Sequence, residues 1–196
     1  MLNEKIFNDR RPEMYLNLPT DPYLWNPLDF FNLYGLNPLP KGKKSLVSIV
    51  QMSSNKDSKK NLENIFKYLD KAKSEKSELV VFPELILTGH LNKNKSAIEK
   101  DDPKILELAK YANKNQMYIY FGFAEKKDNE YFNSSMLLGP EGILGIYRKV
   151  HLNKEDRAWA SEGNEWKFVD TKIGRIGMLI GYDSVFPESA RCLGLY

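Results

Sequence analysis

The sequence has few of the side chains that build cross-links and metal sites. Its 196 residues include one cysteine, Cys192, and only two histidines. A single cysteine excludes a disulfide within the chain, and no cluster of cysteine and histidine offers the ligands of a zinc site. We therefore expect no bound metal and a fold that depends on its hydrophobic core, and a reducing compartment is compatible with this composition.

Long apolar runs are also absent. The longest stretches, such as 79–82 and 178–180, are far shorter than the roughly 20 residues that a helix needs to cross a bilayer. The N-terminus is mixed in charge and lacks the apolar segment of a secretory signal. The sequence predicts a protein that is not integral to a membrane, with the cytoplasm as its location.

No charge of one sign dominates the chain. The 29 basic and 26 acidic residues give a formal net charge of +3 and are interleaved, apart from lysine clusters at 41–44 and 56–60. Clusters of this size usually lie in solvated loops or at helix ends. Binding to nucleic acid or to a membrane surface is therefore not expected.

Residues 1–44 differ in composition from the rest of the chain. They contain six of the ten prolines and the aromatic residues Tyr15, Tyr23, Trp25, Phe30, Phe31 and Tyr34. Proline excludes long helices and central strands, whereas aromatic rings gain free energy when they are buried. We interpret residues 1–44 as an irregular arm that wraps the main domain or a partner subunit, and residues 45–196 as a partial domain.

From residue 45 onward, the hydrophobic pattern alternates between buried strands and amphipathic helices. Apolar residues at 62, 65, 66, 69 and 72 fall on one face of a helix. The segment 139–142, Gly-Pro-Glu-Gly, is typical of a tight turn between strands. The pattern predicts strands at 46–50, 79–82, 117–124, 131–138, 143–150, 166–170 and 176–180, and helices at 57–76 and 103–115. This order favours an α/β sandwich of sheets with helices outside.

Three segments carry residues suited to chemistry. Glu84 follows the strand at 79–82, at the kind of strand end where α/β folds form ligand sites. Lys149 ends the strand at 143–150, and a buried lysine needs a carboxylate partner or a catalytic task. Residues 175–191 run from a strand through a sharp turn at Gly181 into a helix, a geometry that presents nucleophiles and backbone N–H groups. Taken singly, Glu84 could be a strand-end glutamate bonded to a loop, and Lys149 a residue of a solvated strand.

Together these segments resemble the nitrilase superfamily of carbon–nitrogen hydrolases. The matching motifs are Phe82-Pro83-Glu84, Tyr147-Arg148-Lys149-Val150-His151-Leu152, and Gly181-Tyr182-Asp183 followed by Phe186-Pro187-Glu188 and Arg191. Segments 122–125, 131–134 and 139–142 add support. The resemblance covers residues 45–196 and implies a nitrilase-type αββα sandwich. It fails at Gly181, where the family has its catalytic cysteine.

The resemblance implies a mechanism in which a cysteine thiolate attacks a nitrile or amide carbon. Glu84 then corresponds to the general base and Lys149 to the residue that stabilises the oxyanion, with no cofactor. Gly181 stands at the nucleophile position, and Tyr182 beside it is expected to contact substrate. A second acidic residue, which assists the base, corresponds to Asp156, or to Glu155 after a shift of one residue.

Other groups are weaker candidates for the work of the missing thiol. Cys192 lies well along the predicted helix and is expected to be a packing residue. Ser184 is nearer to the turn but has no evident base, and His151 is expected to form a structural hydrogen bond. A water molecule that Glu84 activates is the best substitute, and it predicts slow hydrolysis without a covalent intermediate.

The sequence thus predicts a homologue of hydrolases that act on small amides, nitriles or carbamoyl compounds, with its own activity in question. The alternative is a pseudoenzyme that binds a small molecule or regulates an active paralogue, since members of the family commonly form homo-oligomers. A third hypothesis is a truncated relic without a stable product. Because the family continues beyond the position of Tyr196, the C-terminal part of the sandwich is expected to be missing. One sheet should then have an open edge and an uncovered apolar face.

Overall fold

The computed structural model describes residues 44–90 and 93–195. The predicted arm, residues 1–44, lies outside this part of the chain except for Lys44. The described elements follow the predicted order of strand, helix, strand and helix, and then a run of strands. Within this part, no helix combines the length and the hydropathy that a bilayer crossing requires.

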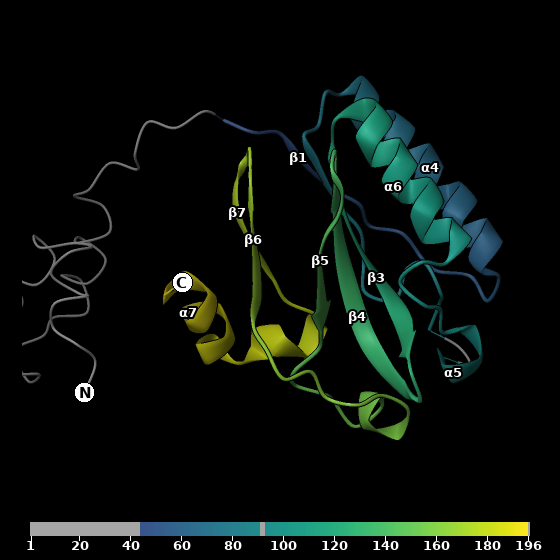
Figure 1. The fold of residues 1–196 in the computed structure, drawn as a ribbon, viewed down its shortest axis with the longest axis vertical. Coiled ribbons are helices and arrows are strands. Elements are labelled where there is room, and N and C mark those ends of the chain that lie inside the picture. Colours follow the sequence, from purple (N-terminus) through teal and green to yellow (C-terminus); the bar gives the residue numbers. More distant parts are fainter. Residues whose placement is uncertain (1–43, 91–92, 196) are drawn as a thin grey trace, which may run out of the picture. The chain divides into compact units, whose positions relative to one another are not determined.

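A five-stranded sheet in the order β1-β2-β3-β4-β5 forms the centre of the described unit (Figure 1). Strands β1 (Val47–Ile49), β2 (Leu79–Val81) and β3 (Tyr118–Lys127) are parallel neighbours. Strands β4 (Glu130–Gly139) and β5 (Gly142–Arg148) continue the sheet antiparallel, joined by the predicted tight turn. Parallel pairs need crossover connections, and helices α4 (Ser58–Ser74) and α6 (Pro103–Asn115) lie in these two crossovers.

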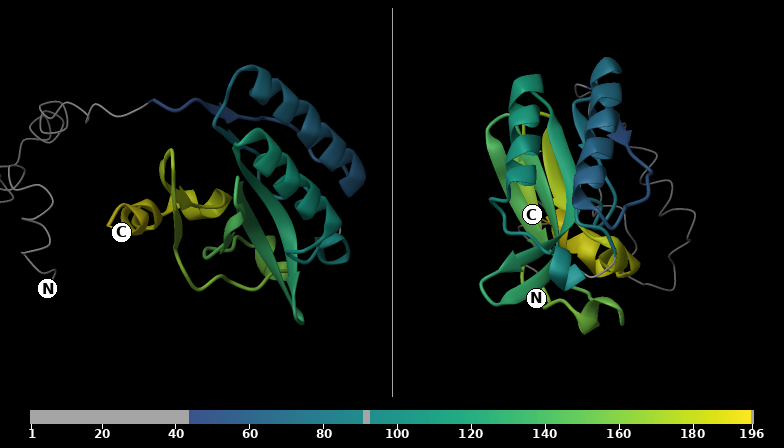
Figure 2. Two further views of the ribbon diagram at one scale, coloured as in Figure 1. Left: turned by 45° about the horizontal axis from the view of Figure 1, so that its top comes forward. Right: turned by 90° about the vertical axis from the view of Figure 1, so that its right-hand side faces the viewer.

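Both long helices begin at aspartate caps and cover one face of the sheet. The side chain of Asp57 accepts a hydrogen bond from the N–H of Lys59, and Asp102 does the same for Lys104. Figure 2 shows α4 and α6 side by side in both of its views. Their inner faces bury Leu62, Ile65, Leu69, Ala72, Ile105, Leu108 and Ala112 against side chains of β2, β3 and β4. This helical layer agrees with the spacing of apolar residues in the sequence.

A hairpin covers the opposite face of the sheet. It consists of β6 (Lys167–Thr171) and β7 (Gly174–Met178). A second core holds Leu79, Tyr118, Leu137, Tyr147, Met178 and Ile180, with Val169 and Ile176 packed against it. Helix α7 (Pro187–Leu195) packs against β7. The packing is close: a Cβ atom added at Gly177 of β7 would stand 3.1 Å from Cδ1 of Leu193 in α7. The layers are therefore helix, sheet, sheet and helix, which confirms the predicted αββα sandwich.

The edge strand β1 carries an apolar strip that the hairpin does not cover. Val47 and Ile49 pair with Leu79 and Val81, so their side chains lie on the face that packs against the hairpin. Ile49 is nevertheless 82% exposed. The strip agrees with the expectation of an uncovered apolar face.

Several local predictions need correction. Strand β5 ends at Arg148, so Lys149 follows the strand instead of belonging to it. The last strand is β7 rather than 176–180, and the sharp turn is a 3₁₀ helix, η3 (Gly181–Val185). The hydrophobic pattern does not predict the short helices α5 (Lys93–Ser96) and η2 (Asp156–Ala158). One turn of helix has no period that a hydrophobic pattern can reveal.

Candidate active site

Glu84 is held just after β2 by a sharply turned loop. The next residue, Leu85, has a φ of +54°, a value rarely adopted by residues other than glycine. The loop packs directly on β3, because a Cβ atom at Gly122 would overlap the backbone of Glu84 and Leu85. The N–H of Leu87 donates to the carbonyl of Gly122 at 3.2 Å. Glycine at position 122 therefore permits the close approach that positions Glu84.

Lys149 lies between two carboxylates and is only 1% exposed. Its Nζ donates to Oε1 of Glu84 at 2.8 Å and to Oδ2 of Asp156 at 2.6 Å. Burial opposes the charged form, but the hydrogen bonds to Asp156 and Glu84 outweigh burial, so the pKa of Lys149 is raised above its usual value. A charged ammonium fixed in this way can donate a hydrogen bond to a carbonyl oxygen or an oxyanion.

Asn133 on β4 connects the same two carboxylates. Its Nδ2 donates to Oε1 of Glu84 at 2.6 Å and to Oδ1 of Asp156 at 3.2 Å, and its side chain is fully buried. Segment 131–134 supports the resemblance in sequence, but the motif predicts no role for Asn133. Nothing in the local pattern identifies it, because its partners come from the β2 loop and from η2.

Gly181 lies at the third corner of the site. It opens η3 with a φ of +42°. A Cβ atom at this position would overlap Oε2 of Glu84 and stand 3.5 Å from Nζ of Lys149. Glu84, Lys149 and Gly181, which are distant in sequence, therefore meet in space.

The surroundings of Gly181 bear on one prediction. The sequence favours a water molecule, in the place of the missing thiol, as the substitute for a nucleophile, and this stays a prediction. The carboxylate of Glu84 instead reaches into the space where the side chain of residue 181 would begin.

Asp183 holds the turn of η3 in place. It is fully buried, and its Oδ2 accepts hydrogen bonds from the hydroxyl of Tyr147 at 2.8 Å and from the N–H of Ile180 at 3.1 Å. Its Oδ1 accepts the N–H of His151 at 2.8 Å. Burial, followed by the hydrogen bond to Asp183, raises the pKa of Tyr147 well above its usual value. One carboxylate thus ties β5 and the loop after it to the glycine turn.

The acidic candidates near the lysine are clearly separated. Asp156 is buried and bonded to Lys149, whereas Glu155 is exposed. The structure therefore brings Asp156, and not Glu155, to the site. The shorter aspartate side chain reaches Lys149 because η2 lies against the loop that carries the lysine.

The remaining candidates have other surroundings. Tyr182 is 41% exposed and contacts the ring of Phe186, and in the part of the chain that is described it makes no hydrogen bond to Glu84 or Lys149. Its contact with substrate stays a prediction. Ser184 donates to the carbonyl of Gly181 at 2.8 Å, and Nδ1 of His151 lies 3.2 Å from Oδ1 of Asp183. Cys192 is a free thiol in α7.

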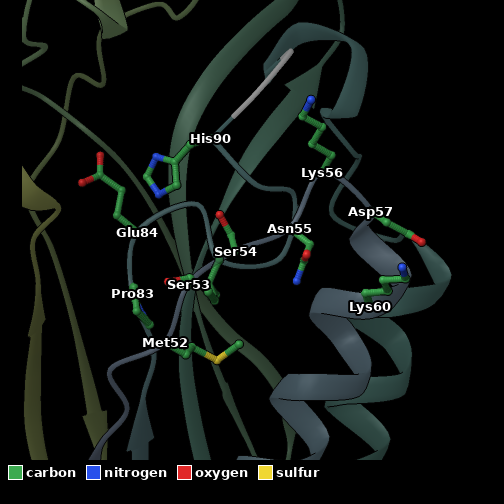
Figure 3. Close-up of a pocket in the computed structure, with 11 residues that line it drawn as sticks. Met52, Ser53, Ser54, Asn55, Lys56, Asp57, Lys60, Pro83, Glu84 and His90 are labelled. Carbon is green, nitrogen blue, oxygen red and sulfur yellow. The ribbon is translucent and has the colours of Figure 1, made fainter.

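A cavity of about 830 Å³ opens beside Glu84 (Figure 3). Its walls come from the loop after β1, the start of α4 and the loop after β2. The lining residues are Met52, Ser53, Ser54, Asn55, Lys56, Asp57, Lys60, Pro83, Glu84, Ile86 and His90. Among the described residues, no group of three or more His, Cys, Asp or Glu side chains could hold a metal ion. Glu84, whose side chain is 28% exposed, is accessible from this cavity.

Comparisons with known proteins point to one family. The carbon–nitrogen hydrolase family model matches residues 46–195, which is most of the described unit. The chain belongs to the carbon–nitrogen hydrolase family. It is 33% identical to a nitrilase of Pyrococcus abyssi over 143 residues, which cover 69% of this chain and 55% of the nitrilase. The chain thus spans about half the length of that relative.

Solved carbon–nitrogen hydrolases share the fold. A carbon–nitrogen hydrolase from Helicobacter pylori G27 matches with a TM-score of 0.69 and 23% identity, over 77% of this chain and 56% of that one. A cysteine-to-alanine variant of the amidase from Nesterenkonia sp. AN1, in complex with butyramide, matches with a TM-score of 0.68 and 20% identity. That match covers 79% of this chain and 62% of the amidase.

Proposed function

We propose that this carbon–nitrogen hydrolase homologue binds a small amide, nitrile or carbamoyl compound at Glu84 and Lys149 without forming a covalent intermediate. The observation that carries the proposal is the meeting of three groups. A buried lysine contacts the carboxylate of Glu84, and both adjoin residue 181, where the covalent route needs a thiolate. Gly181 has no side chain and therefore offers no nucleophile that could attack the ligand.

The polar groups of the site suit such a ligand. The ammonium of Lys149 can donate a hydrogen bond to a carbonyl oxygen, and the carboxylate of Glu84 can accept one from an amide N–H. Glu84 is 28% exposed, so one side of its carboxylate is accessible from the cavity. The complex of a cysteine-to-alanine amidase with butyramide supports the idea that an amide can bind in this fold without the thiol.

The competing function is slow hydrolysis by a water molecule that Glu84 activates. The position of Oε2 of Glu84 argues against it, because the carboxylate lies where a Cβ atom of residue 181 would stand, next to the position from which the nucleophile would attack. The two functions differ in one measurement. Isothermal calorimetry with butyramide should give binding, while ammonia release should stay at the level of the Glu84→Gln variant.

The site assignment can be tested by restoring the thiol with Gly181→Cys. The new side chain must displace the carboxylate of Glu84, and the backbone of residue 181 must keep its positive φ. We expect the two effects to lower the free energy of unfolding by about 1–3 kcal/mol. We expect ammonia release from butyramide to appear in this variant and to disappear when Glu84→Gln is added. The matched control is Gly194→Cys, because a Cβ atom at Gly194 meets no other atom within 4 Å.

Each outcome decides the assignment. Ammonia release from Gly181→Cys, but not from Gly194→Cys, supports Glu84, Lys149 and residue 181 as one site. A folded Gly181→Cys protein that binds butyramide but releases no ammonia would contradict it. The predicted homo-oligomer and the cytoplasmic location remain separate predictions, which light scattering and cell fractionation would test.

A further inference from the structure

A buried ion pair next to Lys149 in the chain has no part in the candidate site as described so far. The carboxylate of Glu125, on β3, is only 2% exposed. Its Oε2 accepts hydrogen bonds from Nε of Arg148 at 2.8 Å and from the hydroxyl of Ser134 at 2.6 Å. Its Oε1 accepts a third from Nη2 of Arg148 at 2.7 Å. Two parallel hydrogen bonds between a guanidinium and a carboxylate fix the orientation of both groups as well as their separation.

The ion pair and the ammonium of Lys149 lie on opposite faces of the sheet. Arg148, the last residue of β5, pairs with Ser134 of β4, and their side chains share the face that α4 and α6 cover. Lys149 is the next residue, so its side chain points to the other face, toward the two carboxylates of the site. Glu125 therefore acts on the ammonium through the backbone at the end of β5.

This backbone is held from both sides. The N–H of Lys149 donates to the carbonyl of Asn133 at 2.9 Å, and the carbonyl of Lys149 accepts the N–H of Gly163 at 2.8 Å. A Cβ atom at Gly163 would overlap the carbonyl oxygen of Arg148, so this segment packs directly on the end of β5. The ring of Phe132 lies 4.7 Å from the guanidinium carbon of Arg148. A shift of Arg148 would therefore carry the backbone of Lys149 with it.

A pair of this kind provides orientation more than stability. The hydration that two charges lose on burial offsets most of their attraction, so apolar side chains of similar volume would stabilise the sheet about as well. The hydrogen bond to Glu125 nevertheless outweighs burial and raises the pKa of Arg148 above its usual value, so the guanidinium stays charged. A group that binds a ligand must be held within about 0.5 Å of its productive position, which a rigid neighbour in the chain can ensure.

We infer that Glu125 is a positioning residue, which acts through Arg148 to set the place of the Lys149 ammonium beside residue 181. The inference rests on the proposed function in one respect, because it takes Lys149 as the group that donates to the ligand. A purely structural ion pair would make a different prediction. Its loss would lower the stability of the sheet but would change the surroundings of residue 181 no more than any other loss of equal size.

The test places a thiol beside the ammonium and uses it as a probe. In the full chain with Gly181→Cys and Cys192→Ser, the only thiol lies at position 181, because the sequence has a single cysteine. Nζ of Lys149 lies 3.5 Å from the Cβ position of residue 181, so the ammonium favours the thiolate. The rate of reaction with iodoacetamide as a function of pH gives the midpoint of the thiol titration.

Glu125→Gln keeps the shape of the side chain and removes its charge. We expect it to raise the midpoint by about one pH unit, as the withdrawal of a neighbouring cation would. Lys149→Gln removes the cation itself and sets the largest shift to be expected. Arg148→Lys keeps the positive charge but cannot form two parallel hydrogen bonds, so it should give a smaller shift in the same direction. It decides the inference if Glu125→Gln does not unfold cooperatively in urea.

The matched control is Leu108→Ala. This buried side chain of α6 belongs to the core on the same face of the sheet, and its truncation lowers the free energy of unfolding without removing a polar group. It should leave the midpoint unchanged. A midpoint that Glu125→Gln leaves in place, or that Leu108→Ala raises equally, would overturn the inference. So would a midpoint that does not respond to Lys149→Gln, because the ammonium would then not lie beside residue 181.

Binding of butyramide separates this inference from the proposed function. In the chain that keeps Gly181, we expect Glu125→Gln to weaken binding about fivefold in isothermal calorimetry, as the misplacement of one hydrogen-bond donor would. If the natural chain does not bind butyramide but the thiol midpoint shifts as expected, Glu125 positions Lys149 and the proposed function fails. If the natural chain and Glu125→Gln bind butyramide equally and the midpoint does not move, the proposed function stands and the positioning role fails.

Discussion

At the scale of single residues, the site is a buried ammonium shared by two carboxylates. Lys149 contacts Glu84 and Asp156, and Asn133 donates to the same pair. The carboxylates of Glu84 and Asp156, which both contact the same ammonium, would repel one another without it. Lys149 therefore makes their approach possible. The same lysine therefore has a structural task whether or not the chain hydrolyses a substrate. The presence of Glu84 and Lys149 in this chain therefore fits both a structural role and a role in hydrolysis.

Buried hydroxyls around this site predict a loss of stability in alkali. Tyrosine in an unfolded chain titrates near 10.0, whereas burial raises the pKa of Tyr120 to about 12. Between these values the unfolded chain releases a proton that the folded chain keeps, so the free energy of unfolding falls as the pH rises. The raised pKa values of Tyr147 and Lys149 act in the same direction.

We expect Tyr120→Phe to flatten this alkaline decline. The group accounts for roughly 3 kcal/mol of the loss between pH 10 and pH 12, if its pKa shift is about two units. The measurement is urea unfolding at pH 8, 10, 11 and 12. Tyr68→Phe is the control, because that side chain is exposed on α4. An identical pH dependence in the natural chain and Tyr120→Phe would refute the prediction.

At the scale of elements, the position of the glycine turn depends on one aspartate. Asp183 accepts hydrogen bonds from Tyr147 of β5, from His151 in the loop that follows and from Ile180, the residue before η3. Because both carboxylate oxygens face donors, an amide in this position would direct its own N–H₂ group at one of them. Elements that are far apart in the sequence are thus joined through a single side chain.

Asp183→Asn should therefore lower the free energy of unfolding by about 3 kcal/mol, the usual loss when a buried donor is left without its acceptor in a network. Urea denaturation at pH 7 gives the value. Asp170→Asn provides the control, since Asp170 forms an exposed ion pair with Arg175 and should matter little. A loss below about 1 kcal/mol for Asp183→Asn would show that the turn does not depend on this carboxylate.

At the scale of the whole molecule, the sandwich is more complete on the helical side than on the hairpin side. Helices α4 and α6 cover β2, β3 and β4, whereas the two-stranded hairpin leaves Val47 and Ile49 of β1 accessible. An exposed apolar strip on an edge strand offers both hydrophobic surface and unpaired backbone groups to another chain. Association of the described unit should therefore begin at β1.

Ile49→Lys is expected to reduce self-association and binding of a hydrophobic dye, with the free energy of unfolding changed by less than about 0.5 kcal/mol. Static light scattering and dye fluorescence measure the two effects. Leu106→Lys, an exposed apolar position on α6, is the matched control and should have a smaller effect. If both variants changed association equally, β1 would have no special part in it.

The order of the elements could be read from the sequence because each is specified locally. The apolar residues of α4 recur at helical spacing, the glycines and Pro140 mark the tight turn, and the motif around Glu84 follows a short buried strand. The motifs also led to the family, and they predicted that Glu84, Lys149 and residue 181 form one site; in the structure these residues lie close together. Boundaries moved by at most three residues, since strand ends depend on neighbouring strands that no local pattern contains.

Only the tertiary structure decided between Asp156 and Glu155 and added Asn133 to the polar groups around Lys149 and Glu84. Asn133 and Asp156 are brought to Lys149 by the pairing of β4 with its neighbours and by the position of η2, and neither contact leaves a periodic signal. The overlap of Glu84 with the side-chain position of residue 181 depends likewise on packing between distant segments. Residue types state which chemistry is available, but distances between side chains arise only when the layers pack.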